Sequence, residues 1–307
     1  MTDNAACYPR PQDGWVKYIG NPVFGNAEIG TCFDVDVQIV NGRYRMYFSW
    51  RPKDSIAYVE SDDGVHWNEK PHIVFGPDPA SGWEDMVNRT CVIRFQDRTL
   101  MWYTGQARGF RRIGCAESID GGETFQRLSD APVMIPELPW EKESVMNPYV
   151  LFDSDRKIFR MWYAAGETFE PNAIGYAESE DGLDWKKSPL NPIFIHGGEP
   201  YDQARVGGCE VVHDTETGGF FMFYIGYYDI DTAGICVAYS PDGVTRWERL
   251  SENPIVSPEP RCWDGDACYK PSVIRDEAES CWKLWYNGRC GSREYIGLAV
   301  HAGLKLS

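Results

Sequence analysis

Five short segments along the chain alternate between apolar and polar or small residues, and each contains aromatic side chains. Alternation with a period of two is typical of a β-strand, whose successive side chains point to opposite faces of a sheet. No stretch shows the spacing of apolar positions that predicts an amphipathic helix. The pattern therefore predicts an all-β protein. The segments are RYRMYFSW (43–50), TLMWYTG (99–105), FRMWYAAG (159–166), FFMFYIG (220–226) and KLWYNG (283–288).

A second motif, which ends in a Ser-x-Asp-Gly turn, follows four of these strands. Its copies are IAYVESDDGVHW (56–67), IGCAESIDGGETF (113–125), IGYAESEDGLDW (174–185) and ICVAYSPDGVTRW (235–247). The aspartate of such a turn caps the backbone, and the glycine supplies a positive φ. Because the turn explains the aspartates, we expect no catalytic role for them. They are Asp63, Asp120, Asp181 and Asp242.

The repeat has a period near 60 residues, since equivalent strand positions lie 55, 60, 61 and 62 residues apart. Those positions are Met46, Met101, Met161, Met222 and Leu284. Four-stranded units repeated around an axis are typical of a β-propeller. We predict a five-bladed β-propeller with four-stranded antiparallel blades that begin near residues 30, 85, 143, 204 and 266. The last unit lacks its final strand and residues 15–24 (WVKYIGNPVF) match it, so the N-terminal strand is expected to close a single domain of residues 1–307.

Charge and composition narrow the partners. The chain carries 46 acidic against 30 basic residues, a formal net charge of −16, which disfavours binding to nucleic acid. Its apolar runs are too short to span a bilayer and its start has no apolar signal region, so we expect a cytoplasmic protein without a membrane partner. Ten scattered cysteines are expected to be reduced core residues, and no metal site is predicted. The oligomeric state stays open.

The repeat also predicts which residues face the propeller axis, because the innermost strand of each blade begins there. Counting back from the aligned positions gives two rings of inward-facing residues, two positions apart. These positions differ in every copy and carry charges, which is unusual at the start of buried strands. They are either ordinary polar strand ends or the lining of a pocket for a polyhydroxylated ligand. The first ring is Asp34, Arg89, Asn147, Gly208 and Lys270, and the second is Asp36, Cys91, Tyr149, Glu210 and Ser272.

Aromatic residues followed by an acid precede four of the inner strands. The pairs are Trp83-Glu84, Trp140-Glu141, Tyr201-Asp202 and Trp263-Asp264. Their recurrence favours a structural role, whereas their place at the expected pocket rim favours stacking on a sugar. No nucleophile elbow, His-Glu-x-x-His, dinucleotide or P-loop motif is present. A pair of carboxylates is therefore the simplest catalytic machinery.

The I-G-x-A-x-S-x-D-G-x-x-W turns, the N-P-I/V segments and the axial acids resemble the five-bladed β-propeller carbohydrate-active enzymes of glycoside hydrolase families 43, 32 and 130. Asp34-Val35-Asp36-Val37 has the spacing of the family 43 base motif D-P-x-I but lacks its proline. Glu210 matches the family's acid only roughly, and Asn147 replaces the aspartate that tunes it. Family 32 is expected to be the weaker resemblance, because its N-D-P-N-G, R-D-P and E-C motifs are absent.

The resemblance implies a glycoside hydrolase that acts on a small neutral saccharide and needs no cofactor. It implies Asp34 as base, Glu210 as general acid, and Asp36 with Tyr149 as tuning residues. The alternative is a family 130-like phosphorylase, with phosphate as co-substrate held by cations and Asp34 as the acid. A non-catalytic sugar-binding propeller is the third possibility. The expected substrate-binding residues are Arg89, Asn147, Tyr149, Glu143, Arg205, Lys270, Trp83, Trp140 and Trp263.

Overall fold

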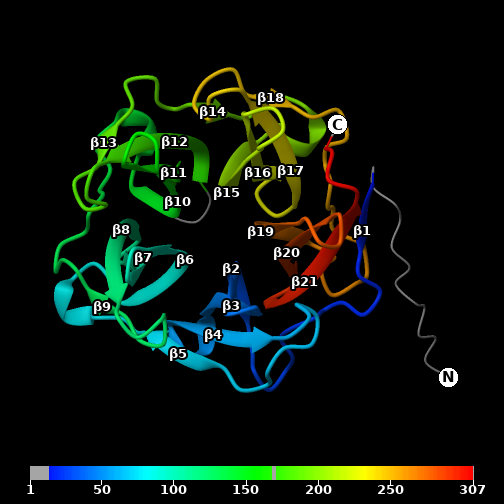
Figure 1. Cartoon of the computed structure of the whole chain (residues 1–307), viewed down its shortest axis with the longest axis horizontal. Helices are drawn as coiled ribbons and strands as arrows, with labels where there is room; N and C mark the ends of the chain where they lie inside the picture. Colours follow the sequence, from blue (N-terminus) through cyan, green and yellow to red (C-terminus); the bar gives the residue numbers. More distant parts are fainter. Residues whose placement is uncertain (1–13, 168–170, 307) are drawn as a thin grey trace.

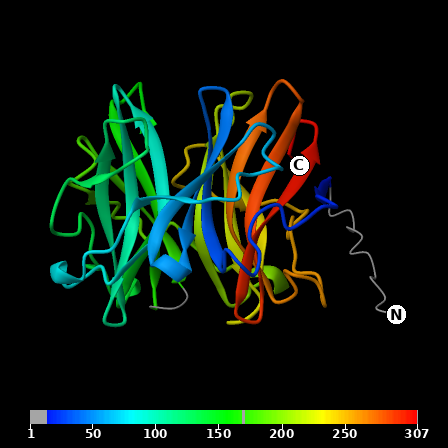
Figure 2. The same cartoon turned by 90° about the horizontal axis from the view of Figure 1, so that it is seen from below.

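The computed structural model describes residues 14–167 and 171–306. Its strands form antiparallel groups, here called blades, around a central axis (Figure 1), and the long strands run along that axis (Figure 2). Blade 1 contains β2 (Cys32–Val40), β3 (Arg43–Trp50), β4 (Ser55–Ser61) and β5 (His72–Phe75). Blade 2 contains β6 (Met86–Phe95), β7 (Arg98–Ala107), β8 (Phe110–Ser118) and β9 (Gln126–Arg127).

The remaining strands form three further groups of the same kind. Blade 3 contains β10 (Ser144–Asp153), β11 (Ile158–Gly166), β12 (Pro171–Ser179), β13 (Lys186–Lys187) and β14 (Phe194–Ile195). Blade 4 contains β15 (Arg205–His213), β16 (Phe220–Tyr227), β17 (Ala233–Ser240) and β18 (Glu248–Arg249). Blade 5 contains β19 (Ala267–Asp276), β20 (Cys281–Cys290), β21 (Arg293–Ala302) and β1 (Trp15–Lys17). The structure confirms the predicted all-β propeller with four-stranded antiparallel groups.

Helical structure is confined, in the described part of the chain, to single 3-10 turns. They are η1 (Arg51–Lys53), η2 (Pro79–Ser81), η3 (Pro139–Glu141) and η4 (Pro200–Asp202). None of these helical segments is long and apolar enough to cross a membrane.

The N-terminal strand completes blade 5. Trp15 pairs with His301 and Lys17 pairs with Ala299, in antiparallel register. Asn21 of the following N-P segment donates to the Leu298 carbonyl (2.9 Å) and accepts from the Leu298 N–H (2.8 Å). In blade 4 Asn253 makes the same two bonds to Val237. The N-terminal segment therefore occupies the place that internal copies fill in other blades.

The Ser-x-Asp-Gly turns hold neighbouring blades together. In the turn of blade 3, the Asp181 carboxylate accepts from two backbone N–H groups, and the Gly182 N–H donates to Ser179 Oγ. Trp102 of blade 2 donates its indole N–H to the Gly182 carbonyl (2.8 Å). Trp162 and Trp285 make the equivalent bonds to Gly243 and Gly64. The repeated aspartates and glycines are thus explained by turn geometry and contacts between blades.

Cysteines lie mainly in the core, with one departure from expectation. Among those the structure describes, seven free thiols are buried and the Cys290 thiol is exposed. Cys262, in contrast, is disulfide-bonded, so the prediction that all ten thiols are free is wrong. Cys262 lies in the loop before β19 rather than in an apolar strand, which is why a rule based on buried strands does not apply to it.

Candidate active site on the propeller axis

Each inner strand is interrupted by a bulge at the residue predicted for the first ring. The strand register shifts between Phe33 and Asp36 in blade 1, and between matching residues in every other blade. Four bulge residues adopt positive φ, at 51° for Asp34, 53° for Arg89, 52° for Asn147 and 39° for Lys270. A left-handed conformation costs non-glycine residues roughly 1–3 kcal/mol and is concentrated at functional sites. The bulges therefore mark the axial end of the blades as a candidate site.

Hydrogen bonds between blades fix three of these bulges. The backbone N–H of Asp34 donates to Asn287 Oδ1 of blade 5 (3.2 Å). In the same way, the Arg89 N–H donates to Ser49 Oγ (2.9 Å) and the Asn147 N–H to Thr104 Oγ1 (3.1 Å). Each bulge is thus tied to the second strand of the preceding blade, so its side chain is held in a defined direction.

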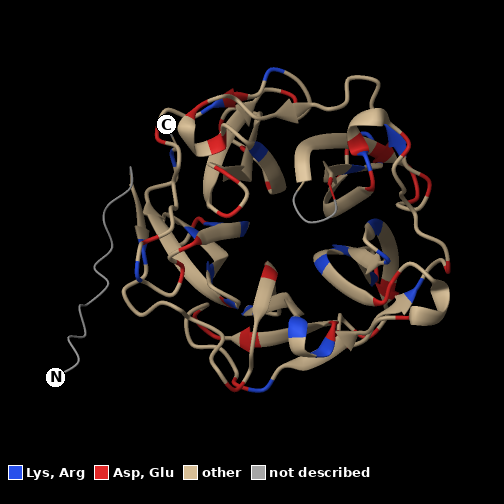
Figure 3. Ribbon diagram, turned by 180° about the vertical axis from the view of Figure 1, so that it is seen from behind, with Lys and Arg blue, Asp and Glu red and all other residues tan. Residues whose placement is uncertain are grey.

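A cavity of about 340 Å³ lies at this end of the axis. Asp34, Arg89 and Asn147, all predicted from the repeat, are among its lining residues. Its carboxylates are Asp34, Asp231 and Glu294, and its guanidinium groups are Arg51, Arg89, Arg111 and Arg289. Amides come from Asn88, Gln106, Asn147 and Asn287, and an apolar wall from Pro171, Ile225, Tyr227, Ile230 and Tyr269. Figure 3 shows charged residues of both signs on strands facing the centre.

Two acceptor atoms in this cavity are buried without a hydrogen-bond donor from the described protein. They are Asp34 Oδ2 and Asn147 Oδ1. Arg89 Nε forms an ion pair with Asp34 Oδ2 at 3.4 Å, outside good hydrogen-bond geometry. The missing side chain of Gly208 leaves room for Asn147, because a Cβ on Gly208 would lie 2.1 Å from Asn147 Nδ2. Buried polar atoms are rarely unpaired, so a ligand with O–H or N–H donors would complete both.

The second ring lies one layer deeper and connects the blades. Asp36 Oδ2 accepts from the Val92 N–H (2.5 Å), and Glu210 Oε1 accepts from the Val273 N–H (3.1 Å). Ser272 and Cys91 accept the equivalent bonds from the next blade. Within the described part of the chain, the lining of the cavity does not include Asp36, Tyr149, Glu210 or Lys270. The residues predicted as acid and tuning groups therefore have a clear structural role.

Burial determines the protonation of this deeper layer. Desolvation raises the pKa of Glu210 to about 8 and that of Asp36 to about 6, although the nearby Lys270 ammonium opposes both shifts. The charge of Asp36 further raises the pKa of Glu210. Burial, together with the charges of Glu210 and Asp36, holds the pKa of Tyr149 well above its ordinary value. Near neutral pH the Glu210 carboxyl is thus mainly protonated.

The aromatic–acid pairs are packed inside the blades rather than on the cavity. Trp83 is buried, stacks on Tyr103 at 6.0 Å and covers Gly105 and Gly114. Trp140 and Trp263 cover equivalent glycines. The acids are buried, and each pairs with a cation of the blade's outermost strand. These pairs are Glu84–Arg127, Glu141–Lys187, Asp202–Arg249 and Asp264–Lys17.

This packing favours the structural role for Trp83, Trp140 and Trp263 over stacking on a sugar, because none of them lines the described cavity. Glu143 and Arg205 also lie outside it. Glu143 is exposed and accepts from Arg112 through its backbone carbonyl, while Arg205 pairs with Glu167 at 3.2 Å.

Counting along the inner strands alone misses Glu294 and the arginines at positions 51, 111 and 289. Glu294 and Arg111 lie two residues before the repeated isoleucine of the third strand, as do Asp54, Asn172 and Ala233 in the other blades. This position differs in every copy, which is the signal that singled out the two rings. Applying it to the third strand as well would have identified both residues.

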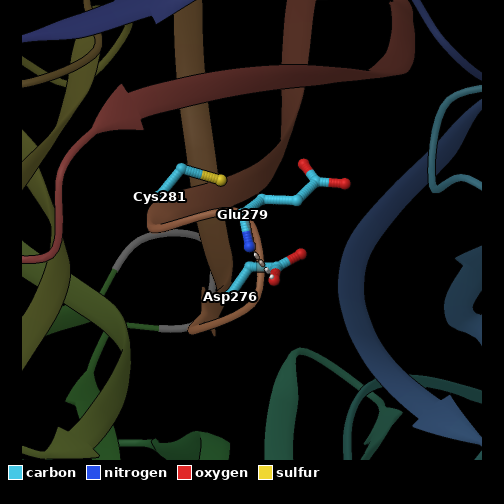
Figure 4. Close-up of side chains that lie close together, drawn as sticks. All are labelled: Asp276, Glu279 and Cys281. Atoms are coloured by element: carbon cyan, nitrogen blue, oxygen red, sulfur yellow. Dashed lines mark hydrogen bonds between the residues drawn. The ribbon is translucent and has the colours of Figure 1, made fainter.

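One cluster in the described chain has the composition of a metal site, but it lies on a hairpin away from the cavity. Asp276, Glu279 and Cys281 lie close together at the turn between β19 and β20 (Figure 4). Lys283 Nζ lies 2.9 Å from the Asp276 carboxylate and 3.1 Å from the Glu279 carboxylate. A cationic side chain already neutralises these acids, so the cluster does not suggest a cofactor.

Comparison with known proteins identifies the family of the chain. The model of the glycosyl hydrolases family 32 N-terminal domain matches residues 36–191, just over half of the chain. This chain belongs to that family. It is a glycoside-processing enzyme. The missing motifs had placed family 32 below families 43 and 130, and the match corrects that ranking. Because the catalytic motifs of the family are absent, the match reflects the repeated framework of blades 1 to 3.

Individual relatives extend the likeness. An uncharacterized protein of Mycobacterium tuberculosis (strain CDC 1551 / Oshkosh) is 28% identical over 275 residues, covering 84% of this chain and 87% of the relative. A beta-1,2-mannobiose phosphorylase of Thermoanaerobacter sp. (strain X514) is 31% identical over 134 residues, covering 38% and 42%. The structure of a thermostable family-43 glycoside hydrolase superposes with a TM-score of 0.73 at 20% identity, covering 91% of each chain. That structural likeness concerns the fold.

Proposed function

We propose that this enzyme hydrolyses the glycosidic bond of a small neutral saccharide in the axial cavity, with Asp34 as the carboxylate that activates water. The observation that carries the proposal is the pair of buried acceptors that receive no hydrogen bond from the described protein, Asp34 Oδ2 and Asn147 Oδ1. Sugar hydroxyl groups are donors of the required kind. The apolar wall on the blade 4 side suits the C–H face of a sugar ring.

The reaction needs two carboxyl groups with different protonation. In glycoside hydrolysis one carboxylate accepts a proton from water, and a protonated carboxyl donates to the leaving oxygen. Asp34 is the cavity carboxylate that the sequence predicts as base, and it is placed on a rigid bulge. The family resemblance implies Glu210 as the acid, and its raised pKa would keep it protonated, but Glu210 is not among the residues that line the cavity.

Activity on a panel of 4-nitrophenyl glycosides tests the proposal. Asp34→Asn should lower kcat on any glycoside that the wild type cleaves by roughly 10²–10⁴, the usual contribution of a positioned acid or base. Asp62→Asn is the matched control, because the Asp62 side chain is 84% exposed and far along the chain from the bulges. Full activity of Asp34→Asn would contradict the proposal. Sugar binding by a wild type that cleaves no glycoside would instead favour a binding protein.

A phosphorylase is the second candidate, and the arginines of the cavity favour it. Arg51, Arg89, Arg111 and Arg289 line the cavity, and guanidinium groups bind phosphate with charge-assisted hydrogen bonds. If phosphate replaces water, product formation should require phosphate and yield a sugar phosphate. Arg89→Ala should then raise the KM for phosphate, whereas a hydrolase should be indifferent to phosphate throughout.

A further inference from the structure

Glu294 brings another carboxyl group to the cavity, from the third strand of a blade rather than from an inner strand. It lies at the start of β21, in the blade that the N-terminal strand completes, and Figure 1 shows this blade beside blade 1. Its side chain is only 13% exposed. Asp34 and Glu294 belong to adjacent blades and line the same cavity, so both can contact one ligand.

A single amide connects the Glu294 carboxyl group to the backbone of the Asp34 bulge. Asn287, which is buried, donates from Nδ2 to Glu294 Oε2 at 2.8 Å. Its Oδ1 accepts from the backbone N–H of Asp34 at 3.2 Å. Because one amide binds the Glu294 carboxyl group and the backbone N–H of Asp34, it ties the Glu294 side chain of blade 5 to the bulge that carries Asp34 in blade 1.

The electrostatic surroundings of the two carboxyl groups differ. Asp34 forms an ion pair with Arg89. Glu294 Oε1 accepts from Arg51 Nη2 at 3.2 Å, but the Arg51 side chain is 54% exposed, so water screens its charge. Burial and the Asp34 charge raise the pKa of Glu294 against the opposing effects of Arg51 and Arg89. An acid and a base are usually placed in such different environments.

We propose that Glu294 is the catalytic proton donor to the glycosidic oxygen, with Asn287 as the positioning residue that orients it toward Asp34. This inference rests on the proposed function. As the bond between the anomeric carbon and the leaving oxygen breaks, its electron pair goes to that oxygen, which takes the proton of the Glu294 carboxyl. Water bonds to the anomeric carbon and gives a proton to Asp34. Exchange with solvent then returns the proton from Asp34 to Glu294.

The dependence on the leaving group tests this assignment. Two aryl glycosides of the same cleaved sugar are compared, one with a 2,4-dinitrophenyl and one with a phenyl leaving group. Glu294→Gln should lower kcat on the phenyl glycoside at least about 100-fold and on the dinitrophenyl glycoside only a few-fold, because a good leaving group needs no proton. Its pH profile should also lose the fall in activity at high pH. Asp34→Asn should impair both substrates.

Two controls separate this role from others. An equal loss on both glycosides would indicate a structural role for Glu294 and overturn the proposal. Glu210→Gln should show no such selectivity, and a leaving-group effect there instead would assign the acid to Glu210. If the wild type cleaves neither glycoside, the proposed function fails.

An NMR titration keeps the assignment of Glu294 testable even then. The carboxyl carbon of Glu294 is identified in ¹³C-glutamate-labelled protein by its disappearance in Glu294→Gln. Its pKa should lie above the ordinary value of about 4.3. A value at or below that would overturn the proposal.

Discussion

The buried carboxylate of Glu141 gives the sharpest test of how the blades are stabilised. It is fully buried and accepts four hydrogen bonds, from Tyr163 Oη (2.7 Å), Lys187 Nζ (2.8 Å) and the backbone N–H groups of Glu137 and Leu138 (2.6 and 2.8 Å). Glu141→Gln removes the charge and turns one acceptor oxygen into a donor that faces other donors. The Lys187 ammonium, only 8% exposed, then lacks its buried counterion.

The expected loss follows from this geometry. Removing one partner of a buried ion pair destabilises a protein by about 3–5 kcal/mol, a large part of the typical total of about 5–15 kcal/mol. Urea unfolding followed by tryptophan fluorescence measures the change in the free energy of unfolding. The matched control is Glu117→Gln, because Glu117 pairs with Arg98 at 2.9 Å but both side chains are substantially exposed. Such a pair should contribute less than about 1 kcal/mol.

A double variant tests the cause of the loss. Lys187→Met removes the buried ammonium, so Glu141→Gln combined with Lys187→Met should lose less than the sum of the single losses. If Glu141→Gln is no worse than Glu117→Gln, the buried acids do not stabilise the blades and the reasoning fails.

Two further predictions concern the deeper ring and the turns. Glu210 keeps its proton up to a pKa of about 8 in the folded state, whereas the unfolded state releases it near about 4.3, so the stability that this group contributes should fall as the pH rises between these values. The stability of Glu210→Gln relative to wild type should therefore increase from pH 5 to pH 8. A constant difference in melting temperature would contradict this. Gly182→Ala and Gly42→Ala both place alanine at positive φ (81° and 79°). The added Cβ at position 182 would lie 2.8 Å from Trp102 Cζ2, whereas the Cβ at position 42 would meet no atom within 4 Å. Gly182→Ala should thus be destabilising by about 1–3 kcal/mol more, and equal losses on unfolding would refute the contact between blades.

Much of the fold could be predicted because each blade contains the same local instructions. The alternating strands and Ser-x-Asp-Gly turns recur with a fixed period, and the inner strands start at Cys32, Met86, Ser144, Arg205 and Ala267, close to the expected positions. The same count places three of the five first-ring residues, Asp34, Arg89 and Asn147, at the cavity, whereas Gly208 and Lys270 do not line it.

The parts that the sequence did not predict depend on packing between distant segments. Whether Trp83 faces a ligand or a neighbouring strand is decided by Gly105 and Gly114, which leave room for its ring, and a local motif cannot show this. Asp34 and Glu210 were both predicted to face the axis. Each inner strand has a bulge between its first-ring and second-ring positions, however, and this bulge places Glu210 in a separate layer from Asp34. Glu294 was missed for a different reason, because it lies on a third strand, at a variable position of the repeat that the count along the inner strands did not include.

The left-handed bulges restrict which side chains evolution or an engineer can place around the ligand. At positive φ, Gly, Asn and Asp are tolerated best, unbranched Arg and Lys are possible, and β-branched residues are strongly disfavoured. The four left-handed positions hold Asp34, Arg89, Asn147 and Lys270, with no valine, isoleucine or threonine. Three of them, Asp34, Arg89 and Asn147, line the cavity on bulges with the same left-handed backbone. New specificities can be built by exchanging these three side chains within that restricted alphabet, while the turns and ion pairs that maintain the scaffold stay untouched.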